Sequence, residues 1–260
     1  MRAGLCCILL LGLFVLPVFG QVEKIRTLKQ SLSSIKDSTQ YVDAVNRISL
    51  LFYEQNADST LYYALRAREI AFRLEYARGL ADATNNMGIV FDIKGNIQLA
   101  LRYYNDAYNQ YTALNDSSNI VQTLMNIGSV YSVSGKDQKA LVNFDKALSL
   151  GNLIAHDSIT AIVIYNYVLI YPQKFTEKQK SAYIERADKI SEKYHDLRLK
   201  LAVQQLRANN LIENKKKKQG VELLEQTLTS ARPRKGCNVF QAGASHCRAK
   251  KLPHVRPTNL

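Results

Sequence analysis

Apolar residues recur at three- and four-residue spacing along most of this chain, and short polar turns interrupt them at regular intervals. One apolar run begins at Val121, stops at the turn Gly135–Asp137, and is followed by a second run from Ala140. Such spacing places apolar side chains on one face of an α-helix. The alternation typical of β-strands is absent from the sequence. The pattern therefore predicts an all-α chain made of helix–turn–helix units.

The helix pairs repeat with a period of 40 residues. The amphipathic segment 21–40 predicts an N-terminal cap helix in front of them. A unit of this kind exposes apolar surface on both sides, so stacking on its neighbours predicts a solenoid. The repeats fill the frames 41–80, 81–120, 121–160, 161–200 and, truncated, 201–230. The identities that recur at this spacing are Asn46, Asn86, Asn126 and Asn166, then Ala67, Ala107, Ala147 and Ala187, then Leu61, Leu101 and Leu141.

Small residues stand where the two helices of a unit should meet. Gly88 and Gly128 lie inside first helices, where Gly costs about 1 kcal/mol relative to Ala, so a packing reason is expected. We expect aromatic rings of the second helices to fill the space beside these glycines. The facing small and aromatic residues are Ala100, Tyr104, Ala107, Ala140, Phe144 and Ala147.

Together these residues resemble the signature of tetratricopeptide repeats (TPRs). The family pattern of Leu-Gly, followed three residues later by Tyr, is matched by Met87, Gly88 and Phe91 and by Ile127, Gly128 and Tyr131. The period departs from the family standard of about 34 residues, and Thr84 and Leu124 replace the signature Trp. The resemblance covers residues 22–230 and implies a right-handed superhelical solenoid of TPR-like repeats.

The first 20 residues have the pattern of a secretory signal peptide. Arg2 precedes an apolar run from Leu5 to Val15, and Pro17 and small residues lead to a predicted cut after Gly20. The run is shorter than the roughly 20 residues that span a bilayer core. We therefore expect an exported, periplasmic or secreted chain without a transmembrane helix after cleavage. An uncleaved membrane anchor is the alternative.

The resemblance also implies a function. In TPR proteins the first helices line a concave groove that holds a peptide or a partner protein. We therefore expect a non-catalytic binding scaffold of the cell envelope. A signal followed by 40-residue repeats is also similar to the sensor regions of bacterial signal-transduction proteins. A truncated sensory region that lacks its histidine kinase or transcription-regulator output domain is thus the alternative.

The four recurring asparagines occupy a position that often faces the groove in this family. Asn both donates and accepts hydrogen bonds, which suits an extended peptide backbone. Hydrogen bonding between adjacent helices explains their recurrence equally well. A clamp for a terminal carboxylate is not expected, because its Lys and Arg positions hold Val42, Asp82, Gln122 and Ile162. The candidate groove residues are Asn46, Ser49, Asn85, Asn86, Asp92, Asn126, Ser129, Tyr165 and Asn166.

The net charge of +13 is unevenly distributed. Residues 21–230 hold 27 basic and 22 acidic residues, whereas residues 231–260 hold seven basic residues and no acid. The repeats lack a basic stripe with interleaved aromatic residues, so nucleic acid is not an expected partner. We interpret Lys215–Lys218 as a solvated turn, with a contact for an acidic partner as the alternative.

Residues suited to catalysis or metal binding are scarce. The repeats contain His156 and His195, both in connections between units, with no Cys and no phosphate-binding loop. We therefore expect no enzyme activity, cofactor or metal. The tail 231–260 is expected to be a disordered basic segment or the product of a shifted reading frame. Its potential zinc ligands lack the short spacing of known sites, and they are Cys237, His246, Cys247 and His254.

A single proline interrupts the repeats. Pro172 is predicted to end the first helix of the fourth unit near Tyr171, because proline lacks the amide donor and its ring clashes with the preceding turn. Thr176 followed by Gln179 predicts a capping box at the start of the next helix.

Overall fold

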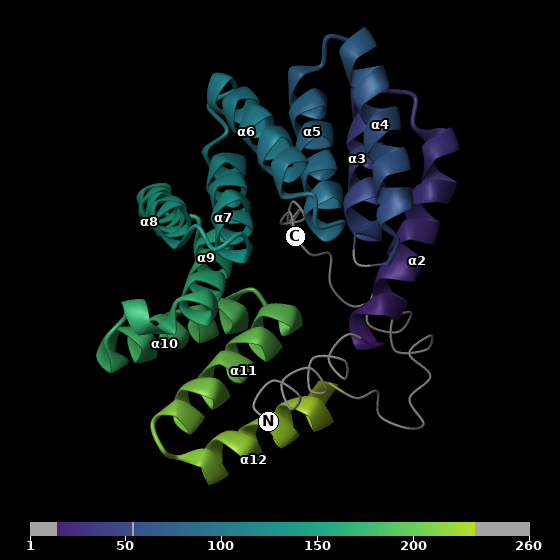
Figure 1. Ribbon diagram of the computed structural model, residues 1–260. Helices are drawn as coiled ribbons and strands as arrows, with labels where there is room; N and C mark the ends of the chain where they lie inside the picture. Colours follow the sequence, from purple (N-terminus) through teal and green to yellow (C-terminus); the bar gives the residue numbers. More distant parts are fainter. Residues whose placement is uncertain (1–14, 54, 232–260) are drawn as a thin grey trace, which may run out of the picture.

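The computed structural model describes residues 15–53 and 55–231, which form eleven α-helices and two short 3-10 helices, with no strand among these residues. Figure 1 shows the helices following one another along a curved path. Most of the predicted signal and the tail beyond Ala231, with its four Cys and His residues, lie outside the described residues. Helix α2 runs through the predicted cut at Gly20. No helix in the described part is both long and apolar enough to cross a membrane.

The 40-residue sequence period is also the period of the helix pairs. The first helices α5, α7, α9 and α11 begin 40 residues apart. Segment 21–40 contains the end of α2, the 3-10 turn η1 and the start of α3. Helix α3 begins after Asp37, whose side chain caps it by accepting a hydrogen bond from the Gln40 amide at 2.8 Å. The bounds are α2 Val15–Ser31, η1 Leu32–Ser34, α3 Ser38–Phe52, α4 Ala57–Arg73, α5 Ala77–Ile93, α6 Ile97–Ala113, α7 Ser117–Val133, α8 Asp137–Leu153, α9 Asp157–Ile170, η2 Pro172–Lys174, α10 Glu177–Lys193, α11 Leu197–Glu213 and α12 Lys217–Ala231.

Nearly the same three-residue turn joins successive helices from α4 onward. The middle residue has a positive φ, and the next amide bonds back to the carbonyl five residues earlier, as from Tyr76 to Ala71 at 2.8 Å. This is the Schellman arrangement, which satisfies the last carbonyls of a helix. The chain therefore reverses within three residues, and successive helices pack side by side. The middle residues are Glu75, Gly95, Asn115, Gly135, Ala155, His195 and Lys215.

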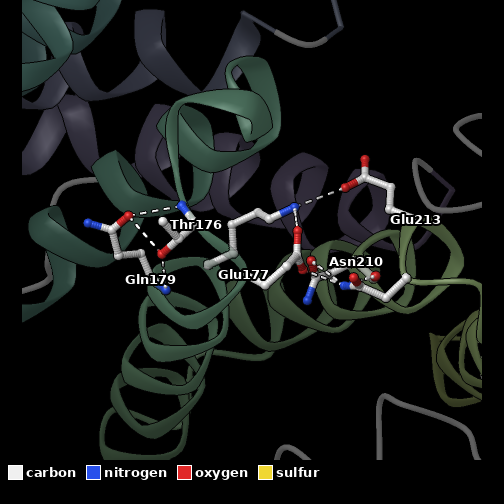
Figure 2. Close-up of polar contacts among 7 residues, drawn as sticks. Thr176, Glu177, Gln179, Asn210 and Glu213 are labelled. Atoms are coloured by element: carbon white, nitrogen blue, oxygen red, sulfur yellow. Dashed lines mark hydrogen bonds and ion pairs between the residues drawn. The ribbon is translucent and has the colours of Figure 1, made fainter.

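The connection after α9 is the exception, and the predictions made for it are confirmed. Helix α9 ends at Ile170, just before Pro172, and is three residues shorter than the 17-residue α7. The Thr176 side chain accepts a hydrogen bond from the Gln179 amide at 3.2 Å, and the Gln179 side chain accepts one from the Thr176 amide at 2.9 Å (Figure 2). This capping box starts α10.

A buried lysine follows this capping box. Lys180 stands where α6 and α8 carry Ala100 and Ala140, and its side chain is only 7% exposed. Its Nζ pairs with Glu177 on α10 and lies 3.3 Å from a Glu213 carboxylate oxygen on α11, which joins these two helices (Figure 2). Burial lowers the pKa of Lys180, but the hydrogen bonds to the two carboxylates outweigh this effect and raise the pKa overall. The lysine therefore stays charged and paired.

Within the second and third repeats, glycines of the first helix contact aromatic rings of the second. A Cβ placed on Gly88 would lie 2.6 Å from Cδ1 of Tyr104, and one placed on Gly128 would lie 3.1 Å from Cδ2 of Phe144. Both rings are almost fully buried. Ala100, Ala107, Ala140 and Ala147 are fully buried on the same second helices. The predicted packing residues thus meet at two equivalent contacts.

Contacts between repeats give the solenoid its curve. Each second helix contacts the first helix of the following repeat, and the first helices contact one another at α3–α5, α7–α9 and α9–α11. In Figure 1, α7, α9 and α11 lie toward the inside of the curve, and α8 and α12 lie toward the outside. The arrangement is an all-α, TPR-like solenoid.

Candidate functional site

A row of accessible side chains recurs on the first helices of the second, third and fourth repeats. Its members recur at three- and four-residue spacing and are partly or fully exposed, whereas most other positions in the middle of these helices are buried. We call this row the inner stripe. It comprises Asp82, Asn85, Ile89 and Asp92 on α5, Gln122, Asn126, Ser129 and Ser132 on α7, and Ile162, Tyr165, Asn166 and Leu169 on α9.

Two of the four recurring asparagines are buried and joined to neighbouring helices. Asn46 on α3 is 5% exposed, and its Nδ2 donates a hydrogen bond to the Gly79 carbonyl on α5 at 2.9 Å. Asn86 on α5 is 4% exposed, and its Nδ2 donates to the Asn46 carbonyl at 3.1 Å. Of the two alternatives left open by the sequence, these contacts match bonding between helices.

The other two asparagines lie on the inner stripe. Asn166 donates to the Ile162 carbonyl at 3.0 Å within α9 and contacts Sδ of Met125 on α7 at 3.4 Å. Asn126 is half-buried, and among the described residues its side chain has no hydrogen-bond partner. Asn126 is therefore the recurring asparagine whose amide remains available to a ligand.

The remaining predicted groove residues also divide into buried residues that bond within the protein and residues that are accessible on the inner stripe. Ser49 is fully buried, and its hydroxyl donates to the Thr60 carbonyl at 2.8 Å, so it lies away from any ligand. Ser129 is accessible but bonds to the Met125 carbonyl at 3.1 Å. Tyr165 is half-buried, and burial raises the pKa of its hydroxyl.

The polar residues on α5 differ in how far they are satisfied. Asn85 is half-buried, and its Oδ1 atom is enclosed without a hydrogen-bond partner among the described residues. Burial raises the pKa of Asp92, while a hydrogen bond from the Tyr104 hydroxyl opposes the rise. The α5 part of the stripe thus combines an enclosed, unpaired amide oxygen with a carboxylate that bonds to Tyr104.

Asp82 is a prominent residue of this region whose environment the sequence does not reveal. Its Oδ1 accepts a hydrogen bond from the Tyr111 hydroxyl of α6 at 2.7 Å, and burial raises its pKa to about 6. Arg78 lies close by and pairs with Asp116, the cap of α7, at 3.3 Å. Asp82 and Tyr111 are 29 residues apart in the sequence, and Arg78 and Asp116 are further apart still, so no local motif marks this cluster.

The chemistry along the inner stripe changes from one helix to the next. The stripe carries two carboxylates and an amide on α5, amides and hydroxyls on α7, and mostly apolar or aromatic side chains on α9. No cluster of three or more His, Cys, Asp and Glu side chains suited to a metal lies in the part of the chain that the structure describes. His156 caps α9 through its Nδ1, and His195 occupies a turn. The stripe can therefore offer hydrogen bonds and apolar contacts to a ligand.

A depression of about 390 Å³ lies along α10, next to the start of α9. Its charged side chains pair with each other or with neighbouring residues. Lys193 contacts Asp157 at 2.6 Å, and Lys189 contacts Glu185 at 2.8 Å. Arg186 donates to Oδ1 of Asn152 at 2.8 Å. These satisfied groups make the depression a weaker candidate than the inner stripe.

No protein-family model and no curated protein matches the chain. Solved structures do resemble it. The apo form of RapI is 17% identical, covers 80% of this chain and 76% of its own, and has a TM-score of 0.60. A Rap protein complexed with Competence and Sporulation Factor is 13% identical, with coverage of 85% and 74% and a TM-score of 0.61.

A third solved structure is named for its repeats. It is a putative kinesin light chain of Podosopora anserina with nearly identical TPR-like repeats, 11% identical, with coverage of 76% of this chain and 97% of its own and a TM-score of 0.50. Identities this low establish the fold alone. In fold, the chain is a TPR-like repeat solenoid.

Proposed function

We propose that this chain is a non-catalytic scaffold that binds a peptide or an extended segment of a partner protein along the inner stripe. The observation that carries the proposal is the row of accessible side chains on α5, α7 and α9, in which the Asn126 amide has no hydrogen-bond partner among the described residues. A peptide backbone offers both the donors and the acceptors that the Asn126 amide lacks.

The chemistry of the stripe also indicates the character of the ligand. Donor groups on the ligand would face the carboxylates of α5, and apolar side chains would face Ile162, Tyr165 and Leu169 on α9. The Rap protein complexed with Competence and Sporulation Factor shares the fold and lends support by analogy. The ligand that fits is a peptide with a polar or basic segment followed by an apolar one.

We further propose that the scaffold acts outside the cytoplasm. The support is the basic start, the apolar run and the small residues before Gly20. Mass spectrometry of the chain expressed in full tests this directly. A mature N-terminus at Gln21 in the exported fraction supports the proposal, whereas an intact Met1 found only in the cytoplasm contradicts it.

Peptide selection followed by substitution tests the binding site. A random peptide library selected on the full chain should yield binders, and Asn126→Ala should weaken the best of them about tenfold, as expected for loss of about 1.4 kcal/mol of hydrogen bonding. Asn105→Ala is the matched control, because Asn105 is exposed on α6 and bonds only within its own helix. Equal affinities for the two variants would contradict binding at the inner stripe.

A further inference from the structure

The junction between α5 and α7 differs from the other junctions of the solenoid. First helices of neighbouring repeats contact one another closely at α3–α5, α7–α9 and α9–α11, and the pair α5–α7 lacks this close contact. Helix α6 contacts both α5 and α7 and lies between them in Figure 1. The second and third repeats are therefore joined mainly through α6.

The hydrogen bonds between first helices show the same break. Asn86 bonds to Asn46 across α3–α5, and Asn166 contacts Met125 across α7–α9. The equivalent Asn126 makes no such bond to α5 among the described residues. The row of amides that links repeats is thus interrupted at α5–α7.

The apolar core is also smallest there. One cluster joins α3, α4 and α5 around Val42 and Ala71, and a much larger one extends from Val121 on α7 to Leu206 on α11. Two smaller clusters connect them. One packs Ala100 and Tyr104 of α6 against Ile127 and Val130 of α7, and the other joins Ala81 of α5 to Ala107 and Tyr111 of α6. Bodies joined by small apolar clusters can move relative to each other at lower cost than the parts of one large core.

Two buried polar atoms without partners among the described residues lie on helices of this junction. In the described part of the chain, Asn85 Oδ1 on α5 and Gln110 Oε1 on α6 are buried without partners, as is Asp188 Oδ1 on α10. An ion pair between the starts of α5 and α7, Arg78–Asp116, has an arginine that is 53% exposed and an aspartate that is 15% exposed. Pairs this exposed contribute at most about 1 kcal/mol. Polar contacts between α5 and α7 are therefore few and weak.

We propose that the solenoid bends at the α5–α7 junction. Residues 38–113 and residues 117–231 move as two blocks about the turn between α6 and α7, and the motion changes the separation of the inner-stripe segments on α5 and α7. Hinges of this kind place the motion in a few residues between packed bodies. The motion belongs to the protein without a ligand, so it holds whether or not the inner stripe binds a peptide.

Pulsed electron spin resonance on the full chain tests this hinge. Cys6, Cys7, Cys237 and Cys247 are first replaced by Ser, so that labels attach only to introduced cysteines. One doubly labelled chain carries Ile93→Cys and Val133→Cys, across α5–α7. The matched control carries Val133→Cys and Leu169→Cys, across α7–α9. All three labelled positions are exposed, so the variants should fold, and circular dichroism checks that they do.

The distance distribution across α5–α7 should be at least twice as wide as the control distribution. Two distributions of equal width, whether both narrow or both broad, would overturn the hinge, because neither result singles out this junction. Removal of the weak link by Arg78→Gln should broaden the α5–α7 distribution further and leave the α7–α9 distribution unchanged. An unchanged α5–α7 width in this variant would contradict the role of the Arg78–Asp116 pair.

Discussion

The second and third repeats carry the same signature but sit in different surroundings. In the second, Tyr104 packs against Gly88, and its hydroxyl reaches Asp92. In the third, Phe144 packs less tightly against Gly128 and stacks on Tyr167 of the next repeat, with ring centroids 5.1 Å apart. The signature thus determines how two helices pair inside a repeat. Residues outside the signature determine how one repeat meets the next.

The largest expected difference between these repeats concerns their glycines. Gly88→Ala should destabilise the protein by about 2 kcal/mol. The new methyl group overlaps the buried ring of Tyr104, and the free energy that this overlap costs exceeds the gain in helix propensity from Ala. Gly128→Ala should change the stability by less than about 0.5 kcal/mol, because the milder contact with Phe144 is offset by the gain in helix propensity. Urea unfolding followed by circular dichroism measures both values, and equal costs would contradict the difference in packing.

A second difference is a carboxylate that only the second repeat possesses. The pKa of Asp82 is raised to about 6 by burial, whereas the third repeat has Gln122 at this position. The folded protein therefore binds a proton more tightly than the unfolded chain, whose Asp pKa is about 4. Stability from this group is present below pH 4 and is lost as the pH rises through 6, by about 1–2 kcal/mol.

Asp82→Asn isolates this effect. The variant should match the wild type at low pH and be more stable at pH 7, because its side-chain oxygen can still accept the hydrogen bond from Tyr111. Chemical unfolding at several pH values gives the comparison, and Gln122→Asn is the control that should leave the pH profile unchanged. A wild-type minus variant difference that stays constant with pH would show that Asp82 titrates normally.

The sequence predicts much of the fold because that part depends on local patterns. The 40-residue period, the helix pairs, the break at Pro172 and the capping box at Thr176 all follow from neighbouring residues. The hydrogen bonding of each recurring asparagine does not follow from neighbouring residues. Asn86 and Asn126 occupy the same place in their repeats, yet only Asn86 bonds to a neighbouring first helix. The Asp82–Tyr111 contact and the lack of close contact between α5 and α7 depend on how the repeats pack on one another, which no local motif encodes.

The asparagines provide a third comparison of the two repeats. Asn86→Ala should destabilise the protein by about 1 kcal/mol, because it removes a buried hydrogen bond to Asn46. Asn126→Ala should leave stability within about 0.3 kcal/mol of the wild type, because no hydrogen bond is lost. Thermal and urea unfolding of the two variants provide the test. A large loss for Asn126→Ala would mean that this residue supports the fold and is not free for a ligand.

The smallest expected effect concerns the turns that end the two repeats. Asn115 and Ala155 occupy equivalent places with φ values of 53° and 51°, in the left-handed region that Asn tolerates and Ala does not. Ala155→Gly should stabilise the protein by about 0.5 kcal/mol, since relief of strain exceeds the added entropy of the unfolded chain. Asn115→Gly should change stability by less than about 0.2 kcal/mol, since the strain at Asn is smaller. Differential scanning calorimetry should show a melting temperature about 1–2 °C higher for Ala155→Gly. Equal shifts for both variants would mean that the two turns are equally strained, and that the repeats differ only in their helices.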